Sequence, residues 1–512
     1  MDKKRSLLNV SVSILSHVIL LIAGFLIRRL LIHYIGNDVN GLNSLYVSII
    51  GVLSVAELGV GSAINYSMYK PIVEGDKIKV AALYRLYQKA YRIIGGVILA
   101  GGLLVMPFLP TLIKDYDGLN VNVYLNFGLV LLSVVLSYLY GAKTSLINAY
   151  KNNYLTTGIT TVCHLIQYGL KAVVLIVFQS FPLFLACNII GTLLVWGVTE
   201  DIARRQHKDI LVIHAYVDRD TRKDISRNIR AMMIHKIGGV LVNTVDSVII
   251  SAFIGVVVLG KYSNYTQLIG MVTGIISLFF TPLVSVIGHL CAGGNKGEIK
   301  FYFERFYFLN YALGVVFFLG YYAVCDQIIR LFFGDGLELS RIIAFVITLN
   351  RFVQFMRHAT LLFRNATGTF YYDRWKPIAE GISNLILSLL FVCIFPEELK
   401  VVGVIVATII TNLMICDIVE PYVVFKHVFK ESAKRFCLRN YLLIGLFVGG
   451  LFGLNYVLQP ERDIFINGMI SVAVSLLLLG LVLLVDRNFR REIRGLWRDA
   501  VRMGQRWIKR SR

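Results

Sequence analysis

The chain has 512 residues, of which 56% are hydrophobic and only 16% charged, and its mean hydropathy is +0.68. A soluble protein of this length would need far more polar surface, so the composition excludes a soluble protein and indicates a polytopic membrane protein. The 52 Lys and Arg against 31 Asp and Glu would suggest a nucleic-acid partner, but the charges lie between apolar segments. We therefore expect anionic membrane lipids, and not nucleic acid, to meet these charges.

The chain shows few signs of a catalytic or metal centre. Its seven cysteines are scattered without CxxC or His/Cys ligand spacing, so we interpret them as small core residues and expect no metal site. The longest polar loop, residues 201–230, contains no dinucleotide-binding, phosphate-binding or HExxH motif. We expect no catalytic residues and no cofactor; Na+ and H+ are the only ions that we consider as ligands. The basic residues 1–5 precede an apolar segment too long for a signal peptide, which predicts an uncleaved first helix.

At about 20 residues per span, the sequence predicts an all-α membrane protein with about fourteen transmembrane helices. The predicted extents are 7–32, 41–68, 90–113, 121–143, 154–178, 181–201, 229–253, 260–289, 306–331, 340–364, 376–396, 400–425, 440–459 and 464–486. With the amino terminus inside, 41 of the 52 Lys and Arg fall in inner loops and tails, and 8 at outer ends. This asymmetry predicts a multi-pass membrane protein with both termini in the cytoplasm.

A weak internal repeat divides the chain. The pattern Tyr34-Ile35-Gly36, four residues and Gly41 recurs as Phe253-Ile254-Gly255, four residues and Gly260, which predicts two six-helix bundles in parallel orientation. The predicted domains are an amino-terminal bundle (1–201), a basic cytoplasmic linker (202–228), a carboxy-terminal bundle (229–425), two additional spans (426–486) and a basic cytoplasmic tail (487–512). Apolar residues recur at roughly helical spacing in this tail, so we expect an amphipathic helix on the membrane surface, with a frayed tail as the alternative.

The tenth predicted span, residues 340–364, is unusual because it carries Arg351, Arg357 and His358 within an apolar helix. An arginine at the centre of a span costs roughly 2.5–3.5 kcal/mol, so it usually faces a protein interior or a watery cavity. On a helical projection Arg351, Gln354 and His358 share one stripe, which lies beside that of Arg357. A planar guanidinium offers paired donors to phosphate oxygens and stays charged when desolvated. We therefore predict that these four residues bind an anionic group within the bilayer.

Three further basic residues fall inside the first and fifth spans, and each has two interpretations. Arg28 and Arg29 lie towards the outer end of the first span, and Lys171 lies in the outer third of the fifth. They either line the substrate cavity or extend their long side chains to the outer interface. We include all three among the candidate residues that bind the anionic group.

Acidic and amide groups in the spans are candidates for ion coupling. Glu57 shares a polar stripe with Asn65 in the second span, and Asp246 lies within the seventh. These groups either bind a coupling cation or balance a buried positive charge. The competing interpretation of Arg351 and Arg357 follows from this: they pair with Glu57, Asp246 or another acid and hold the two halves together.

Several segments resemble the polysaccharide transporter, or Wzx-like oligosaccharide flippase, branch of the multidrug/oligosaccharidyl-lipid/polysaccharide (MOP) exporter superfamily. The resemblance extends nearly end to end, from Ser6 to about Lys434. The matching segments are Glu57-Leu58-Gly59-Val60-Gly61-Ser62-Ala63-Ile64, Tyr69-Lys70-Pro71, Tyr91-Arg92-Ile93-Ile94-Gly95, Pro107-Phe108-Leu109-Pro110, His235-Lys236-Ile237-Gly238-Gly239, Tyr262-Ser263-Asn264-Tyr265, Asp373-Arg374-Trp375-Lys376-Pro377 and Glu420-Pro421-Tyr422.

The resemblance implies a function that the residues alone do not give. It implies a flippase that moves polyprenyl-diphosphate-linked oligosaccharide from the cytoplasmic to the outer leaflet for cell-surface polysaccharide synthesis. It also implies alternating access around a cationic central cavity, with a polysaccharide polymerase and glycosyltransferases as partners. The alternative is a cation-coupled exporter of drugs or metabolites with the same fold. A membrane enzyme that transfers or polymerises the glycan is disfavoured by the short outer loops and by the lack of an acidic catalytic cluster.

Overall fold

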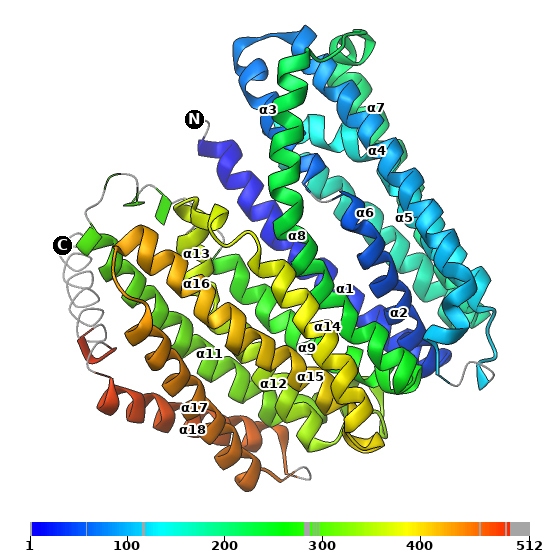
Figure 1. Cartoon of the computed structure of the whole chain (residues 1–512). Helices are drawn as coiled ribbons and strands as arrows, with labels where there is room; N and C mark the ends of the chain where they lie inside the picture. Colours follow the sequence, from blue (N-terminus) through cyan, green and yellow to red (C-terminus); the bar gives the residue numbers. More distant parts are fainter. Residues whose placement is uncertain are drawn as a thin grey trace, which may run out of the picture. The chain divides into compact units, whose positions relative to one another are not determined.

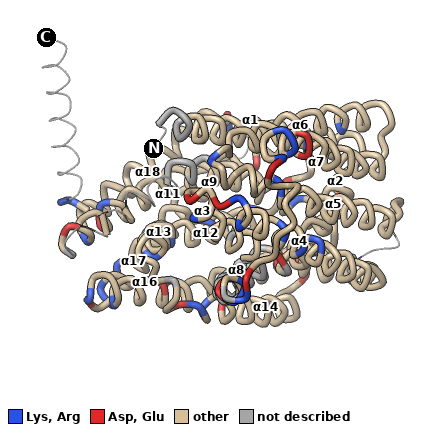
Figure 2. The backbone as a smooth tube through the Cα atoms, turned by 90° about the horizontal axis from the view of Figure 1, so that it is seen from above, with Lys and Arg blue, Asp and Glu red and all other residues tan. Residues whose placement is uncertain are grey.

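The computed structural model describes residues 3–491 except positions 58, 115–117, 281–286, 289, 292, 294–295, 460–461 and 487–488. All regular structure in this part of the chain is helical (Figure 1). Over their described residues, the fourteen predicted spans fall on one helix or on consecutive helical segments, so the predicted fold class is confirmed. Ten of the described helices are long and apolar enough to cross a membrane, as judged by length and composition. Charged positions are sparse along these helices (Figure 2).

The chain divides into two compact units. Unit 1 comprises residues 1–263 and 377–400, and unit 2 comprises residues 264–376 and 401–512. The predicted linker 202–228 is largely helical, because only residues 213–218 separate α7 from α8. Most of the predicted tail, residues 492–512, lies outside the described residues. The predicted domain boundaries remain predictions.

Unit 1 is built from long helices joined by short turns. It contains α1 (Lys3–Tyr34), α2 (Asn37–Leu53), η1 (Ser54–Glu57), α3 (Val60–Glu74), α4 (Lys77–Val105), η2 (Met106–Leu112), α5 (Val123–Ala149), α6 (Asn153–Val173), the π-helical η4 (Val174–Phe178), α7 (Phe181–Val212), α8 (Arg219–Phe253), the start of α9 (Val256–Phe280), nearly all of α14 (Lys376–Ile394) and η6 (Glu397–Leu399). Asparagine and aspartate cap several of these helices: the side chain of Asp76, for example, accepts a hydrogen bond from Lys79 N at 2.8 Å.

Unit 2 is organised around the long helix α11, which packs against α12, α13, α17 and α18. The stacked rings of Phe352 on α12 and Phe447 on α17, 3.5 Å apart between centroids, form part of its core. The unit contains the rest of α9, α11 (Lys296–Phe333), α12 (Arg341–Met356), α13 (His358–Ala366), η5 (Thr369–Tyr371), α15 (Lys400–Thr411), the π-helical η7 (Asn412–Cys416), α16 (Asp417–Val424), the π-helical η8 (Phe425–Phe429), α17 (Lys434–Val457) and α18 (Ile464–Val485).

Two of the interruptions within predicted spans carry a candidate site residue. The span predicted as 41–68 is split into α2 and α3, because Gly59 has a left-handed backbone with φ of +86°. This break places Glu57 in a 3-10 turn within the span. The span predicted as 340–364 is split into α12 and α13 at Arg357. Interrupted helices are common where membrane proteins bind ions or polar substrates.

The repeat detected in the sequence corresponds to a close packing contact within unit 1. Both copies begin a helix after a glycine of positive φ, +134° at Gly36 before α2 and +131° at Gly255 before α9. A Cβ at Gly41 of α2 would lie 1.9 Å from the backbone oxygen of Val256, and a Cβ at Gly260 would lie 2.4 Å from that of Asn37. The second glycine of each copy therefore allows the two helix beginnings to touch through their backbones.

We expect Gly41→Ala and Gly260→Ala each to lower the free energy of unfolding by about 3 kcal/mol or more, because the added methyl meets backbone that cannot rotate away. Thermal unfolding of the purified protein in detergent measures this effect. Gly158→Ala on α6 is the matched control, since a Cβ there meets nothing within 4 Å. It should leave stability unchanged or raise it by up to about 1 kcal/mol. Equal midpoints for all three variants would show that the contact does not constrain the fold.

Candidate functional site

Arg351, in the middle of α12, has no acidic partner in the part of the chain that the structure describes. Its Nη1 donates a hydrogen bond to Gln354 Oε1 at 3.1 Å, and Gln354 Nε2 donates to Asn350 Oδ1 at 3.3 Å. The side chain is partly buried. Neutral amides orient a guanidinium but do not balance its charge, so α12 carries a positive charge that no described acid balances, within the tenth predicted span.

Arg357, between α12 and α13, instead forms an ion pair with Glu420. Its Nη2 donates to Glu420 Oε1 at 2.6 Å, its Nε donates to Glu420 Oε2 at 3.1 Å, and its Nη1 contacts Asn412 Oδ1. Lys376 Nζ donates to the same Glu420 Oε1 at 2.6 Å. The Glu420 side chain is 1% exposed, so a single buried carboxylate holds two cations. The alternative that Arg357 pairs with an acid therefore describes the geometry found here.

The Glu420 cluster continues through neighbouring helices of unit 2. Asp417, one turn before Glu420, accepts a hydrogen bond from Asn440 Nδ2 at 3.2 Å, and Asn440 Oδ1 accepts one from Tyr307 at 2.6 Å. These groups come from α16, α17 and α11. Asp417 and Glu420 were not among the candidate site residues predicted from the sequence. The sequence offered one signal for them: the tenth span carries two arginines in its interior without an assigned counter-ion, and two acids lie just before Pro421.

The candidate His358 and the nearby Arg364, both on α13, have local partners. The His358 ring packs on Phe355, with 4.9 Å between the ring centroids. Arg364, near the end of α13, pairs with the buried Asp373 at 2.5 Å. The structure therefore brings Arg351 together with Gln354, and places Arg357 and Arg364 each against an acid.

In unit 1 the three predicted cations have different environments. Arg28 Nη1 donates to Ser263 O at 2.9 Å and to Ser263 Oγ at 3.3 Å, which joins α1 to α9. Arg29 is exposed on α1. Lys171 on α6 is 8% exposed, makes no ion pair with a described residue, and places its Nζ 4.4 Å from the Phe184 ring centroid. Lys171 is thus a buried cation held against an aromatic face.

Glu57 is held by phenol groups at the break between α2 and α3. Glu57 Oε1 accepts a hydrogen bond from Tyr91 at 2.5 Å, and Oε2 accepts one from Tyr138 at 3.1 Å. Tyr91 in turn accepts a hydrogen bond from Tyr87 at 3.0 Å. Gly61 leaves room for these rings, because a Cβ there would lie 2.6 Å from both hydroxyls of Tyr87 and Tyr91. The described residues offer this carboxylate no cationic partner, so it can take up a proton or a small cation.

The described surroundings of the other two candidate coupling residues, Asp246 and Asn65, do not indicate a cation site. Asp246 is buried on α8, and Asn65 lies partly buried on α3, one turn after Gly61. Asn65 Oδ1 has no hydrogen-bond partner among the described residues. No group of three or more His, Cys, Asp or Glu side chains that could hold a metal ion is found in that part of the chain.

An apolar groove of about 750 Å³ lies on the surface of unit 2, between α9, α11 and α18. Aliphatic and aromatic residues line most of it, including Leu268, Val316, Phe317, Phe465 and Leu476. Arg351 is not among the residues that line this groove.

No protein-family model matches the sequence, and no curated protein matches it. Solved structures do match, with low sequence identity and long coverage. The lipid II flippase MurJ in an inward closed conformation has a TM-score of 0.60 at 14% identity, over 93% of this chain and 99% of that one.

Two structures of MATE transporters also match. An inward-facing MATE transporter of the MOP superfamily has a TM-score of 0.55 at 12% identity, over 84% of this chain and 94% of that one. A variant of the Vibrio cholerae MATE transporter VcmN has a TM-score of 0.55 at 13% identity, over 81% and 97%. The chain therefore has the fold of these MOP transporters.

Proposed function

We propose that the protein is a flippase that moves polyprenyl-diphosphate-linked oligosaccharide across the bacterial cytoplasmic membrane by alternating access, for the synthesis of a cell-surface polysaccharide. The observation that carries this proposal is Arg351, a cation in a membrane span with no acidic partner among the described residues. An uncompensated guanidinium in this setting is suited to a diphosphate, whose oxygens accept its paired donors. Both termini would lie in the cytoplasm.

The fold supports transport rather than catalysis. The solved structure with the highest TM-score given above is named as a lipid II flippase, which makes a lipid-linked substrate the natural first candidate for this chain. The apolar groove of unit 2 would hold the polyprenyl chain, while Arg351, Arg28, Arg29 and Lys171 would attract the diphosphate and glycan. Glycosyltransferases would supply the substrate, and a polymerase would consume it.

Binding of an ion at Glu57 would couple transport to an ion gradient. This carboxylate is fixed by two tyrosine hydroxyls and, among the described residues, is not neutralised by a cation. Uptake of H+ or Na+ there would change the charge at the break between α2 and α3, where an altered turn could shift the equilibrium between two conformations.

A deletion strain tests the transport direction. Without the protein, lipid-linked oligosaccharide should accumulate on the inner leaflet, and surface polymer should be lost. A plasmid copy of the wild-type chain should restore both. Normal polymer in the deletion strain, without precursor accumulation, would contradict the proposal.

Glu57→Gln should abolish the stimulation of transport by an imposed proton or sodium gradient, because a neutral amide cannot exchange a proton or neutralise a cation. The measurement compares initial rates in proteoliposomes with and without each gradient. Glu74→Gln, which changes an exposed glutamate near the end of α3, is the matched control and should keep the stimulation. A Glu57→Gln protein that still responds to both gradients would exclude this site.

The second candidate is a cation-coupled exporter of drugs or metabolites. The Glu57 carboxylate and the fold shared with MATE transporters favour it. Its expected result is drug resistance on expression, together with unchanged surface polymer in the deletion strain. Arg351 argues against it, because a central cation repels cationic drugs.

A further inference from the structure

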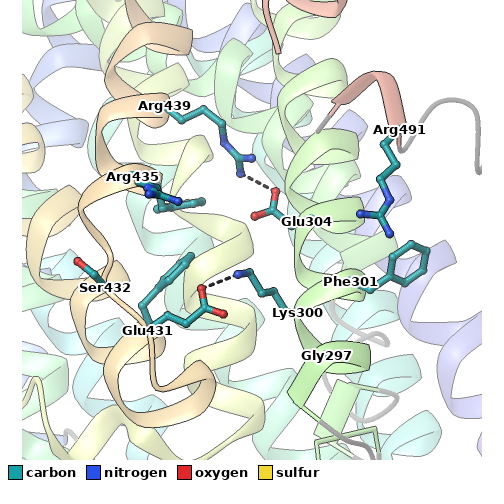
Figure 3. A pocket seen from close by; sticks show the side chains of 11 residues that line it. Gly297, Lys300, Phe301, Glu304, Glu431, Ser432, Arg435, Arg439 and Arg491 are labelled. Atoms are coloured by element: carbon teal, nitrogen blue, oxygen red, sulfur yellow. Dashed lines mark hydrogen bonds and ion pairs between the residues drawn. The ribbon is translucent and has the colours of Figure 1, made fainter. Parts of the chain in front are cut away.

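A separate polar pocket of about 470 Å³ lies in unit 2, between the beginning of α11, the beginning of α17 and the residues that follow α18 (Figure 3). It is separate from the groove described above, because the two share no lining residue. The charged residues that line it are Lys300, Glu304, Glu431, Arg435, Arg439 and Arg491.

The positive charges in this pocket outnumber the negative ones by two. Lys300 Nζ lies 2.5 Å from Glu431 Oε2, which neutralises one cation. Arg435 and Arg491 are exposed and make no ion pair with any described residue. Figure 3 shows them on opposite sides of the pocket, Arg435 on α17 and Arg491 beyond α18. An anion placed between them would be attracted from two sides.

Arg439 supplies buried donors. Its side chain is 14% exposed, and Nη2 lies 2.7 Å from Glu304 Oε2. A second carboxylate faces the same guanidinium, because Arg439 Nε lies 3.8 Å from Asp486 Oδ2, although neither Nε nor Nη2 makes a hydrogen bond of good geometry with a described residue. The guanidinium is held instead over the rings of Tyr307 and Phe489, at 5.0 and 5.4 Å from the centroids. Arg439 is therefore paired with acids, and the attraction for an anion comes mainly from Arg435 and Arg491.

We propose that this pocket binds a phosphate group, either the headgroup of an anionic phospholipid or a soluble phosphate. Guanidinium groups match the geometry of phosphate oxygens, and a volume of about 470 Å³ accommodates a glycerophosphate headgroup. The loop-charge prediction places this end of α11 and α17 at the cytoplasmic surface, where anionic headgroups are concentrated. The inference is independent of the transported substrate.

The test measures thermal unfolding of the full-length protein in detergent, titrated separately with short-chain phosphatidylglycerol, phosphatidylcholine and inorganic phosphate. A ligand that binds only the folded state raises the unfolding midpoint as its concentration increases. Arg435→Gln and Arg491→Gln together should raise the half-saturating concentration about 25-fold, since each such cation contributes about fivefold. Both side chains are exposed, so the double variant should fold normally.

A variant with Lys430→Gln and Lys434→Gln is the matched control, because it removes two exposed charges from the same region outside the pocket lining. It should bind like the wild type. A response to phosphatidylglycerol alone identifies a lipid headgroup site, and a response to inorganic phosphate as well identifies a general phosphate site. If neither anion shifts the midpoint, or if both double variants respond equally, the proposal is wrong.

Discussion

Glu420→Gln is expected to lower the free energy of unfolding by about 3–5 kcal/mol, the range observed when one partner of a buried ion pair is removed. Glu420 is the shared acceptor of Arg357 and Lys376 and is 1% exposed. A glutamine keeps the shape of the side chain, but it removes the negative charge that Arg357 and Lys376 share at Glu420. Thermal unfolding in detergent should show a large drop in the midpoint.

Glu398→Gln provides the control for this change, because Glu398 is an exposed acid of η6. Its effect should be within about 0.5 kcal/mol, as for most surface substitutions. A Glu420→Gln protein as stable as this control would show that the Glu420 cluster does not stabilise unit 2. Arg357 would then again be a candidate for substrate binding.

Arg351→Gln should reduce transport by about 10- to 100-fold, since a hydrogen bond to a charged group contributes about 1.5–3 kcal/mol. It should not reduce stability, because no described acid depends on Arg351 for its counter-charge. Arg351→Lys keeps the charge but loses the planar fork, and should therefore retain part of the activity. Polymer export and the amount of protein in the membrane are measured together.

The matched control for Arg351 is Arg330→Gln, which removes an exposed arginine of α11 that pairs with Glu338 at 2.8 Å. Exposed pairs contribute little to stability, so export and protein amount should both be unchanged. Full polymer export by Arg351→Gln at wild-type protein levels would remove the residue on which the proposed function depends.

The helical spans could be predicted from the sequence, because long apolar segments leave few other structures in a membrane. The repeated glycines at Gly41 and Gly260 could also be recognised, although their backbone contact could not. The breaks at Glu57 and Arg357 were not predicted. Gly59 is one of 43 glycines, and the residues beside it in the sequence do not indicate that its backbone is left-handed.

The partners of the candidate charges depend on tertiary packing. Arg357 and Glu420 are 63 residues apart, and their pairing follows from the packing of α13 against α16. The tyrosines around Glu57 come from α4 and α5, where their spacing resembles that of ordinary core residues. Sequence reasoning could therefore identify which charges lie inside spans, but not which of them are neutralised. Arg351 is not neutralised by any described acid, whereas Arg357 is neutralised by Glu420.

The most direct measurement of the central claim uses purified protein in liposomes that carry a fluorescent polyprenyl-diphosphate oligosaccharide. The fraction of lipid accessible to an impermeant quencher reports movement between leaflets. Wild-type protein should accelerate this movement over protein-free liposomes, and Arg351→Gln should return it close to the protein-free rate. Equal rates for wild-type and Arg351→Gln proteins, or no acceleration by either, would contradict the account.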